Sequence, residues 1–143
     1  AMKDGRVIGA DVVLKYQAGA FPGSAVNAGA MAALACYDIE HATITGYDVV
    51  SNRATSAAYR APGAPMAAFA IESALDELAL KLSIDPIDLR LANAVRDNAK
   101  AIYGATFRNI AFVDTLEAIK AHPHYAAPLG PNQGRGVACG FWF

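Results

Sequence analysis

The sequence predicts an α+β fold, and three observations support this prediction. Runs rich in β-branched residues at 6–17 and 41–50 predict strands, whereas apolar residues at helical spacing predict a long helix after residue 65. The chain is 55% apolar and only 17% charged, so it has enough apolar surface to form a packed core. Because the order is strand, helix, strands, several helices and a strand, α+β is the natural class.

The length and the charge of the chain exclude several classes of protein function. The chain has 143 residues, about the size of one ordinary domain. Its 12 basic and 13 acidic residues leave a net charge of -1, without the basic footprint of a nucleic-acid or membrane-surface binder. The longest apolar run, 28–36, is much shorter than the roughly 20 residues of a transmembrane helix. Cys36 and Cys139 are expected to be reduced, buried and cytosolic.

Both ends of the chain have the character of interior segments. Asp4-Gly5 is a strong signal for a tight hairpin turn, and a strand is expected over 6–17 after it. The partner strand of that β-hairpin would precede the chain. Residues 136–143 form an apolar, strand-like run that ends without a turn signal. We therefore expect a fragment of a larger protein.

Loops and a small-residue helix separate the two strand regions. A Gly/Pro loop over 17–24 should end the first strand, and Ser24 is expected to be the N-cap of a helix over 25–36. Residues 41–50 are expected to form one or two strands, and 51–64 a loop.

The long helix is expected to begin at Pro65, because a first-turn position needs no amide donor. One face carries apolar residues at spacings of three and four, namely Ala67, Ile71, Leu75, Leu78 and Leu82. Met66, Phe69 and Leu80 point in other directions, so the helix is predicted to be buried on more than one side.

Two shorter helices and a last strand complete the expected elements. Asp85 and Pro86 form an N-cap and first-turn signal for a helix that runs to about residue 95. A weaker helix is expected over 113–121, where His122-Pro123-His124 ends it, and an open loop then leads to the strand at 136–143.

Most candidate chemical groups have an ordinary structural interpretation. His122 and His124 lack the spacing of zinc ligands and the two cysteines are solitary, so no protein-ligated metal is expected. Glu72 is interpreted as a surface carboxylate rather than a general base, and the acidic pair 76–77 as part of the solvated helix face. The glycines of 130–136 precede a strand, which favours a surface connection over a phosphate-binding loop.

The loop 57–65 differs from these groups. It brings Tyr59 and Arg60 into a turn stiffened by two prolines and a glycine, directly before the long helix. Glycine lets a backbone approach a ligand closely, and the free amides of a helix N-terminus suit an anion. These residues leave a binding site and a purely structural loop equally open.

At this loop the sequence resembles a known family. The stretches that carry the resemblance are Ala58-Tyr59-Arg60-Ala61-Pro62-Gly63-Ala64-Pro65, 68–72 and 75–79. They are similar to the molybdenum-cofactor-binding large subunit of the xanthine dehydrogenase, aldehyde oxidase and carbon monoxide dehydrogenase family. Residues 84–93 resemble the helix after that family's cofactor loop, and 134–138 match its pattern farther on.

The resemblance implies both a fold and an activity. Residues 1–143 would be a single partial domain of the large subunit, in which strands pack with a long buried helix and shorter helices. The full-length protein would be an oxidoreductase that oxidises aldehydes or N-heterocyclic and aromatic substrates with oxygen derived from water. Electrons would leave through iron–sulfur clusters and FAD on partner subunits or domains, in the cytoplasm. The fragment alone is expected to be inactive and to contain no catalytic residue.

The resemblance also implies site residues. Tyr59, Arg60 and Ala61 would lie beside the molybdenum–pterin cofactor, and Pro62 and Gly63 would line the substrate pocket. The pterin would hold the molybdenum, so no protein residue is expected to ligate it. Alanine at position 61 argues against carbon monoxide dehydrogenase, which would have a cysteine there.

Departures from the family pattern limit what the resemblance implies. Ala28 falls where xanthine enzymes carry a purine-positioning arginine, which disfavours xanthine as the substrate. The family's glycine-rich cofactor motif and general-base glutamate lie outside residues 1–143, and Glu72 does not take the glutamate's role.

An alternative function remains open beside the enzyme. It is a non-catalytic, stand-alone binding or interaction module that reuses this fold segment. The enzyme would have as partners the remainder of the large subunit, the iron–sulfur and flavin subunits and a small-molecule substrate. Self-association of the chain through open strands is expected, because unpaired strands bind one another.

Overall fold

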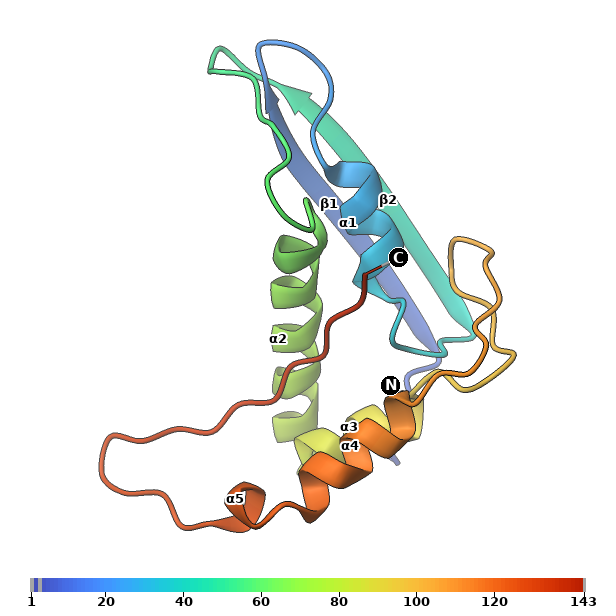
Figure 1. Ribbon diagram of the computed structural model, residues 1–143, viewed down its shortest axis with the longest axis vertical. Helices are drawn as coiled ribbons and strands as arrows, with labels where there is room; N and C mark the ends of the chain where they lie inside the picture. The colour runs from blue at the N-terminus through green and yellow to red at the C-terminus, as the bar shows by residue number, and fades with distance from the viewer. Residues whose placement is uncertain (1, 3, 143) are drawn as a thin grey trace.

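The computed structural model describes residue 2 and residues 4–142. Its elements are β1 (Gly9–Gly19), α1 (Val26–Ala33), β2 (His41–Val50), α2 (Ala64–Leu82), α3 (Pro86–Asn93), α4 (Phe112–Ala121) and α5 (Pro123–Ala126). This order confirms the α+β class (Figure 1). None of the helices among the described residues is long and apolar enough to cross a membrane.

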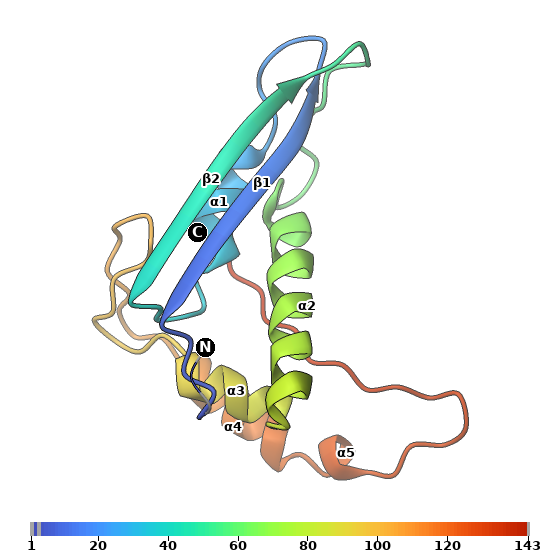
Figure 2. The ribbon, with the colours of Figure 1, turned by 180° about the vertical axis from the view of Figure 1, so that it is seen from behind.

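The two strands form a parallel pair. Gly9 lies opposite His41 and the pairing continues to Gln17 opposite Val49, after which the register shifts. Asp4-Gly5 forms a local turn, in which the Gly5 amide donates to the Met2 carbonyl over 3.0 Å, but β1 belongs to no hairpin in the described chain. The expected hairpin would pair β1 with a strand that precedes the chain, so it stays a prediction. Within the described residues the chain crosses from β1 to β2 through α1, which covers one face of the pair (Figure 2).

The helix α1 begins later and ends earlier than expected. Its N-cap is Ala25, and no side chain caps it. Ser24 is not the cap because its amide, like that of Gly23, donates to the carboxylate of Asp48 on β2, over 3.0 and 2.8 Å. These bonds hold 23–24 in the loop outside the helix.

The helix α2 confirms the expected start but not the expected burial. Pro65 lies in its first turn, and Ala67, Leu75 and Ala79 are buried. Phe69 and Leu80, however, are 78% and 81% exposed. Burial on more than one side is therefore wrong, because no element of residues 4–142 covers the outer face of α2.

The last part of the chain contains less regular structure than expected. Asp85 caps α3 through its carboxylate, as predicted, and α4 lies close to its predicted range. Residues 136–142, which we call the C-terminal strap, are not a strand. The strap runs across α2 (Figure 1), where the Cys139 amide donates to the Glu72 carboxylate over 2.9 Å instead of to a neighbouring strand.

The core lies where α2, α3 and α4 meet the segment after α1. One cluster joins Val7, Cys36, Tyr37, Leu75, Ala79 and Leu89. Two further clusters share Phe112 with it. Cys36 is buried, Cys139 is half-buried and both are free thiols, so the expected burial is confirmed for Cys36 and only in part for Cys139.

Candidate functional site

The loop between β2 and α2 is anchored first at the end of β1. The Ser51 amide donates to the Gly19 carbonyl, and both the amide and the hydroxyl of Ser56 donate to the Ala18 carbonyl, over 2.8 and 3.1 Å. Gly19 has a φ of 86°, and a Cβ there would lie 2.2 Å from the Ala54 carbonyl oxygen. Only glycine therefore allows the loop to lie this close to the strand.

The second anchor lies where the loop enters α2. The Tyr16 hydroxyl on β1 donates to the Gly63 carbonyl over 2.7 Å. Gly63 has a φ of 86°, and a Cβ there would lie 2.2 Å from the Ala25 carbonyl oxygen. Ala61 also has a positive φ, 43°, which is uncommon for a residue with a side chain. The turn 61–63 is thus both tightly packed and conformationally strained.

A cavity of about 490 Å³ opens beside these anchors. Because β1 and β2 are parallel, their carboxyl ends lie at the same end of the pair, and the loops after both strands meet there (Figure 1). Ligand sites in open parallel sheets favour this position. The lining comes from the end of β1, from residues 23–28 at the start of α1 and from the loop 56–63 with the first turn of α2.

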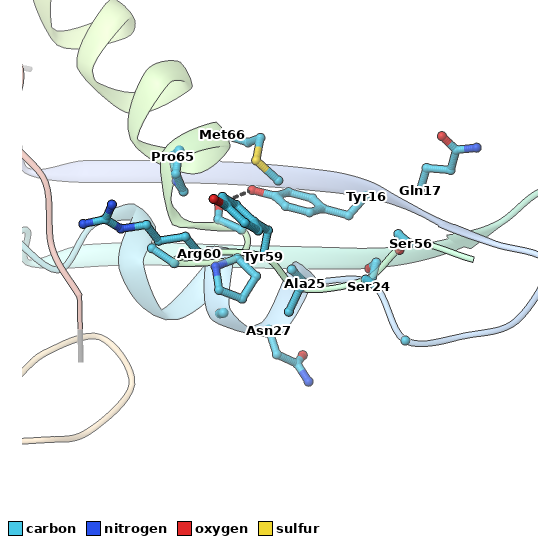
Figure 3. Close-up of a pocket in the computed structure, with 17 residues that line it drawn as sticks. Tyr16, Gln17, Ser24, Ala25, Asn27, Ser56, Tyr59, Arg60, Pro65 and Met66 are labelled. Carbon is cyan, nitrogen blue, oxygen red and sulfur yellow. Dashed lines mark hydrogen bonds between the residues drawn. The ribbon is translucent and has the colours of Figure 1, made fainter. Parts of the chain in front are cut away.

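All five residues that the resemblance assigns to the site line this one cavity: Tyr59, Arg60, Ala61, Pro62 and Gly63. Tyr59 and Arg60 are exposed, Ala61 and Pro62 are partly buried and Gly63 is buried. Figure 3 shows the Arg60 side chain extending away from the side of the cavity where Tyr16 and Gln17 lie. The structure therefore brings the assigned residues together, while their roles remain a prediction.

Sequence reasoning missed part of the cavity wall. Tyr16 on β1, Ser24 in the loop before α1, Asn27 on α1 and Ser56 in the loop before α2 also line the cavity (Figure 3). Strand alternation was a usable signal for Tyr16, because it shares the inward face of β1 with Val12 and Leu14. The packing of α1 on β1, which brings the other residues there, has no local signal.

The cavity combines a neutral, mostly small-residue lining with one cationic side chain. Arg60 is its single charged lining residue, and no carboxylate lines it. Burial raises the pKa of Tyr16, so that its hydroxyl stays protonated and remains a hydrogen-bond donor. This lining suits a ligand with an anionic part and an uncharged part.

A second polar cluster lies apart from the cavity. Glu72 is buried and accepts bonds from Arg90, at 2.9 Å, and from the Tyr37 hydroxyl, at 2.6 Å. The interpretation of Glu72 as a surface carboxylate is therefore wrong: tertiary packing places Arg90, itself fully buried, directly against it. Asp76 matches its expected place on the solvated face in part, because it is 42% exposed yet also pairs with Arg90.

The Glu72–Arg90 cluster is structural rather than acid–base machinery. The Arg90 guanidinium also donates to the Val137 carbonyl, so the cluster holds the C-terminal strap against α2. Burial and the negative charge of Glu72 raise the pKa of Tyr37 far above its ordinary value, which keeps its hydroxyl a donor. Glu72 does not line the cavity with Tyr59–Gly63.

The described residues hold no group of three or more His, Cys, Asp or Glu side chains that could bind a metal. The His122 side chain caps α5, since its Nδ1 atom accepts the His124 amide over 3.2 Å.

Comparison with known proteins gives consistent matches. Residues 1–94 match the family model described as a molybdopterin cofactor-binding domain. The chain is 31% identical over 121 residues to the nicotinate dehydrogenase large molybdopterin subunit of Eubacterium barkeri, covering 82% of this chain and 28% of that protein. It is 33% identical over 102 residues to the aldehyde oxidoreductase of Megalodesulfovibrio gigas, covering 71% of this chain and 11% of that protein.

Solved structures agree with these sequences. The aldehyde oxidoreductase of Desulfovibrio desulfuricans superposes with a TM-score of 0.77 at 28% identity, over 87% of this chain and 14% of that chain. This chain therefore spans less than a third of the length of these relatives. The cavity at the carboxyl ends of β1 and β2 thus lies in a chain that belongs to the molybdopterin cofactor-binding domains of the xanthine dehydrogenase, aldehyde oxidoreductase and carbon monoxide dehydrogenase family.

Proposed function

We propose that the protein carrying this chain is a molybdenum hydroxylase in which residues 59–63 form one wall of the active site. It would oxidise aldehydes or N-heterocyclic and aromatic substrates with oxygen derived from water. The observation that carries the proposal is that Tyr59, Arg60, Ala61, Pro62 and Gly63 all line one cavity in a chain of this family. The cofactor, when bound, supplies the redox chemistry.

The residues present fit a molybdenum–pterin cofactor. A phosphate-bearing pterin is anionic, and the cavity has a cationic side chain, Arg60, without any acidic residue in its lining. Arg60 forms no ion pair within residues 4–142, so its charge is available to a ligand. The backbone of 59–61 would lie along the cofactor, held by the two loop anchors at Ser56 and Gly63.

The substrate side of the cavity is small and uncharged. Pro62 and Gly63 would face the substrate, and Ala28 lies in the same lining. An alanine at this point offers no charge for a polar purine, which favours neutral aldehydes or heterocycles over xanthine. The remainder of the large subunit, and iron–sulfur and FAD modules that accept the electrons, would complete the enzyme. Free thiols at Cys36 and Cys139 support a cytoplasmic location.

The proposal is tested on the purified full-length protein. We expect stoichiometric molybdenum and pterin, turnover in a screen of aldehydes and N-heterocycles, and incorporation of ¹⁸O from labelled water into the product. Full-length protein that holds neither molybdenum nor pterin would contradict the proposal. Such a result, together with tight binding to another protein, would favour the interaction module instead.

The placement of the cofactor is tested with a matched pair of arginines. Arg60→Ala should weaken cofactor retention about tenfold, because it removes a charge-assisted contact. Arg53→Ala, in the same loop but outside the cavity lining, should leave molybdenum content unchanged. Equal molybdenum content in the two variants would show that Arg60 does not contact the cofactor.

A further inference from the structure

Residues 59–62, the tip of the loop between β2 and α2, have few polar contacts with the rest of the chain. Within residues 4–142, neither Tyr59, Arg60 nor Pro62 forms a hydrogen bond or an ion pair. The tip is therefore held from its two ends, by Ser56 on one side and Gly63 on the other. Both ends are tied to β1, at Ala18 and Tyr16, two residues apart on one strand.

The contact at Tyr16 is the more specific of the two. It reaches across 47 positions of sequence and joins a side chain to the Gly63 carbonyl, which also accepts the first helical bond of α2 from Ala67 over 3.2 Å. The hydroxyl is closely packed: a Cβ at Gly29 would lie 2.7 Å from its oxygen and 3.2 Å from the Gly63 carbonyl oxygen. Neither the hydroxyl nor the turn has room to shift toward α1.

We propose that Tyr16 is a positioning residue of the site: its hydroxyl holds the Gly63 carbonyl and thereby fixes where the backbone of 59–63 meets the bound ligand. The hydrogen bond from Tyr16 and the close packing of its hydroxyl between Gly29 and Gly63 rest on the geometry alone, whereas the identity of that ligand rests on the proposed function. Tyr16 acts through Gly63 and does not need to touch the reacting atoms. A purely space-filling Tyr16 would be replaced by phenylalanine without effect.

The test is Tyr16→Phe in the full-length protein, with Tyr47→Phe on β2 as the matched control. Tyr47 is half-exposed and lies outside the cavity lining, and its hydroxyl forms no hydrogen bond within the described residues. Exchange of the Ala64 and Ala67 amides, which donate to the Ala61 and Gly63 carbonyls, should become about fivefold faster in Tyr16→Phe and stay unchanged in the control. Exchange in α3 should not change in either variant.

Two further measurements distinguish a positioning role of Tyr16 from a general loss of folded protein. In Tyr16→Phe, kcat per bound molybdenum should fall about tenfold, because small displacements in a site are costly. The electron paramagnetic resonance spectrum of the molybdenum should change as well. A structural defect would lower molybdenum content but leave both kcat per molybdenum and the spectrum as in the wild type.

A double-mutant cycle tests whether the close packing of Gly29 against the Tyr16 hydroxyl holds that hydroxyl in place. Gly29→Ala should displace the Tyr16 hydroxyl, so adding Tyr16→Phe to it should accelerate exchange of the Ala64 and Ala67 amides no further. Gly136→Ala, where a Cβ meets nothing within 4 Å, is the control and should combine additively with Tyr16→Phe. Wild-type exchange of the Ala64 and Ala67 amides in Tyr16→Phe overturns the proposal. If the wild-type protein contains no molybdenum or pterin, the proposed function is wrong, and so is the ligand named here. The exchange data still test whether the Tyr16 hydroxyl holds the Gly63 carbonyl.

Discussion

The buried pair of Glu72 and Arg90 links three parts of the chain through two side chains. Arg90 donates to Glu72 on α2, to the Pro86 carbonyl on its own helix and to the Val137 carbonyl of the C-terminal strap. Burying charges is costly unless they are paired and hydrogen-bonded, and here the pair is saturated with partners. The pair therefore makes the position of the strap depend on α2 and α3.

Removing one partner of this pair should destabilise the protein strongly. Glu72→Ala leaves the fully buried Arg90 guanidinium with only Asp76 as a carboxylate partner, so we expect a loss of about 3–5 kcal/mol in the free energy of unfolding. Urea unfolding measures the loss. Glu77→Ala, an exposed acid on the same helix, is the control and should stay within about 0.5 kcal/mol of the wild type. Equal effects in the two variants would contradict a structural role for the pair.

Among the elements, α3 is the one whose start is set most locally. The Asp85 carboxylate accepts the amides of Ile87 and Asp88 over 2.8 and 3.2 Å, and Pro86 occupies the first turn. The other Asp85 oxygen accepts the Tyr125 hydroxyl from α5 over 2.8 Å. The cap therefore also ties α5 to the start of α3.

Asp85→Ala should lower the free energy of unfolding by about 1 kcal/mol, because two amides of the first turn lose their acceptor. Thermal unfolding of the wild type and the variant checks this value. Asp85→Asn keeps a capping oxygen and should lose only a small part of the stability. If the asparagine and alanine variants lose the same amount, the carboxylate charge rather than the cap is the stabilising feature.

The molecule as a whole leaves two surfaces with exposed apolar side chains uncovered. One face of the β1–β2 pair carries no helix (Figure 2), although parallel strands are usually buried on both faces. On it, Val13 and Val49 are 54% and 41% exposed. The outer face of α2 presents Phe69 and Leu80, and a net charge of -1 gives little repulsion between copies.

The 143-residue chain by itself should therefore self-associate. Sedimentation velocity should show the average mass rising with concentration, and added salt should not reverse it, because the contacts expected between copies are made by apolar side chains. Phe69→Lys should reduce the association. A single monomeric species over the whole concentration range would contradict the prediction.

Local chemistry made several features predictable. The Asp85 cap, Pro65 in the first turn of α2 and the Gly63 turn depend on residues within a few positions of one another, so their signals survive in the sequence. The motif at 59–63, which lines the cavity, is likewise a continuous stretch of sequence and could therefore be recognised without the fold. The expected burial of Phe69 failed because helical periodicity does not say whether another element covers a face.

The amino-acid sequence alone was sufficient for the family, the α+β class and the stretch that lines the cavity, because each is written in short-range patterns. The parallel pairing of β1 with β2, the burial of Glu72 against Arg90 and the contact from Tyr16 to Gly63 required the folded chain. Glu72 and Arg90 are 18 positions apart, and Tyr16 and Gly63 are 47 positions apart. Such pairs have no local signal, since their free energy arises only when packing excludes water and brings the partners within bonding distance.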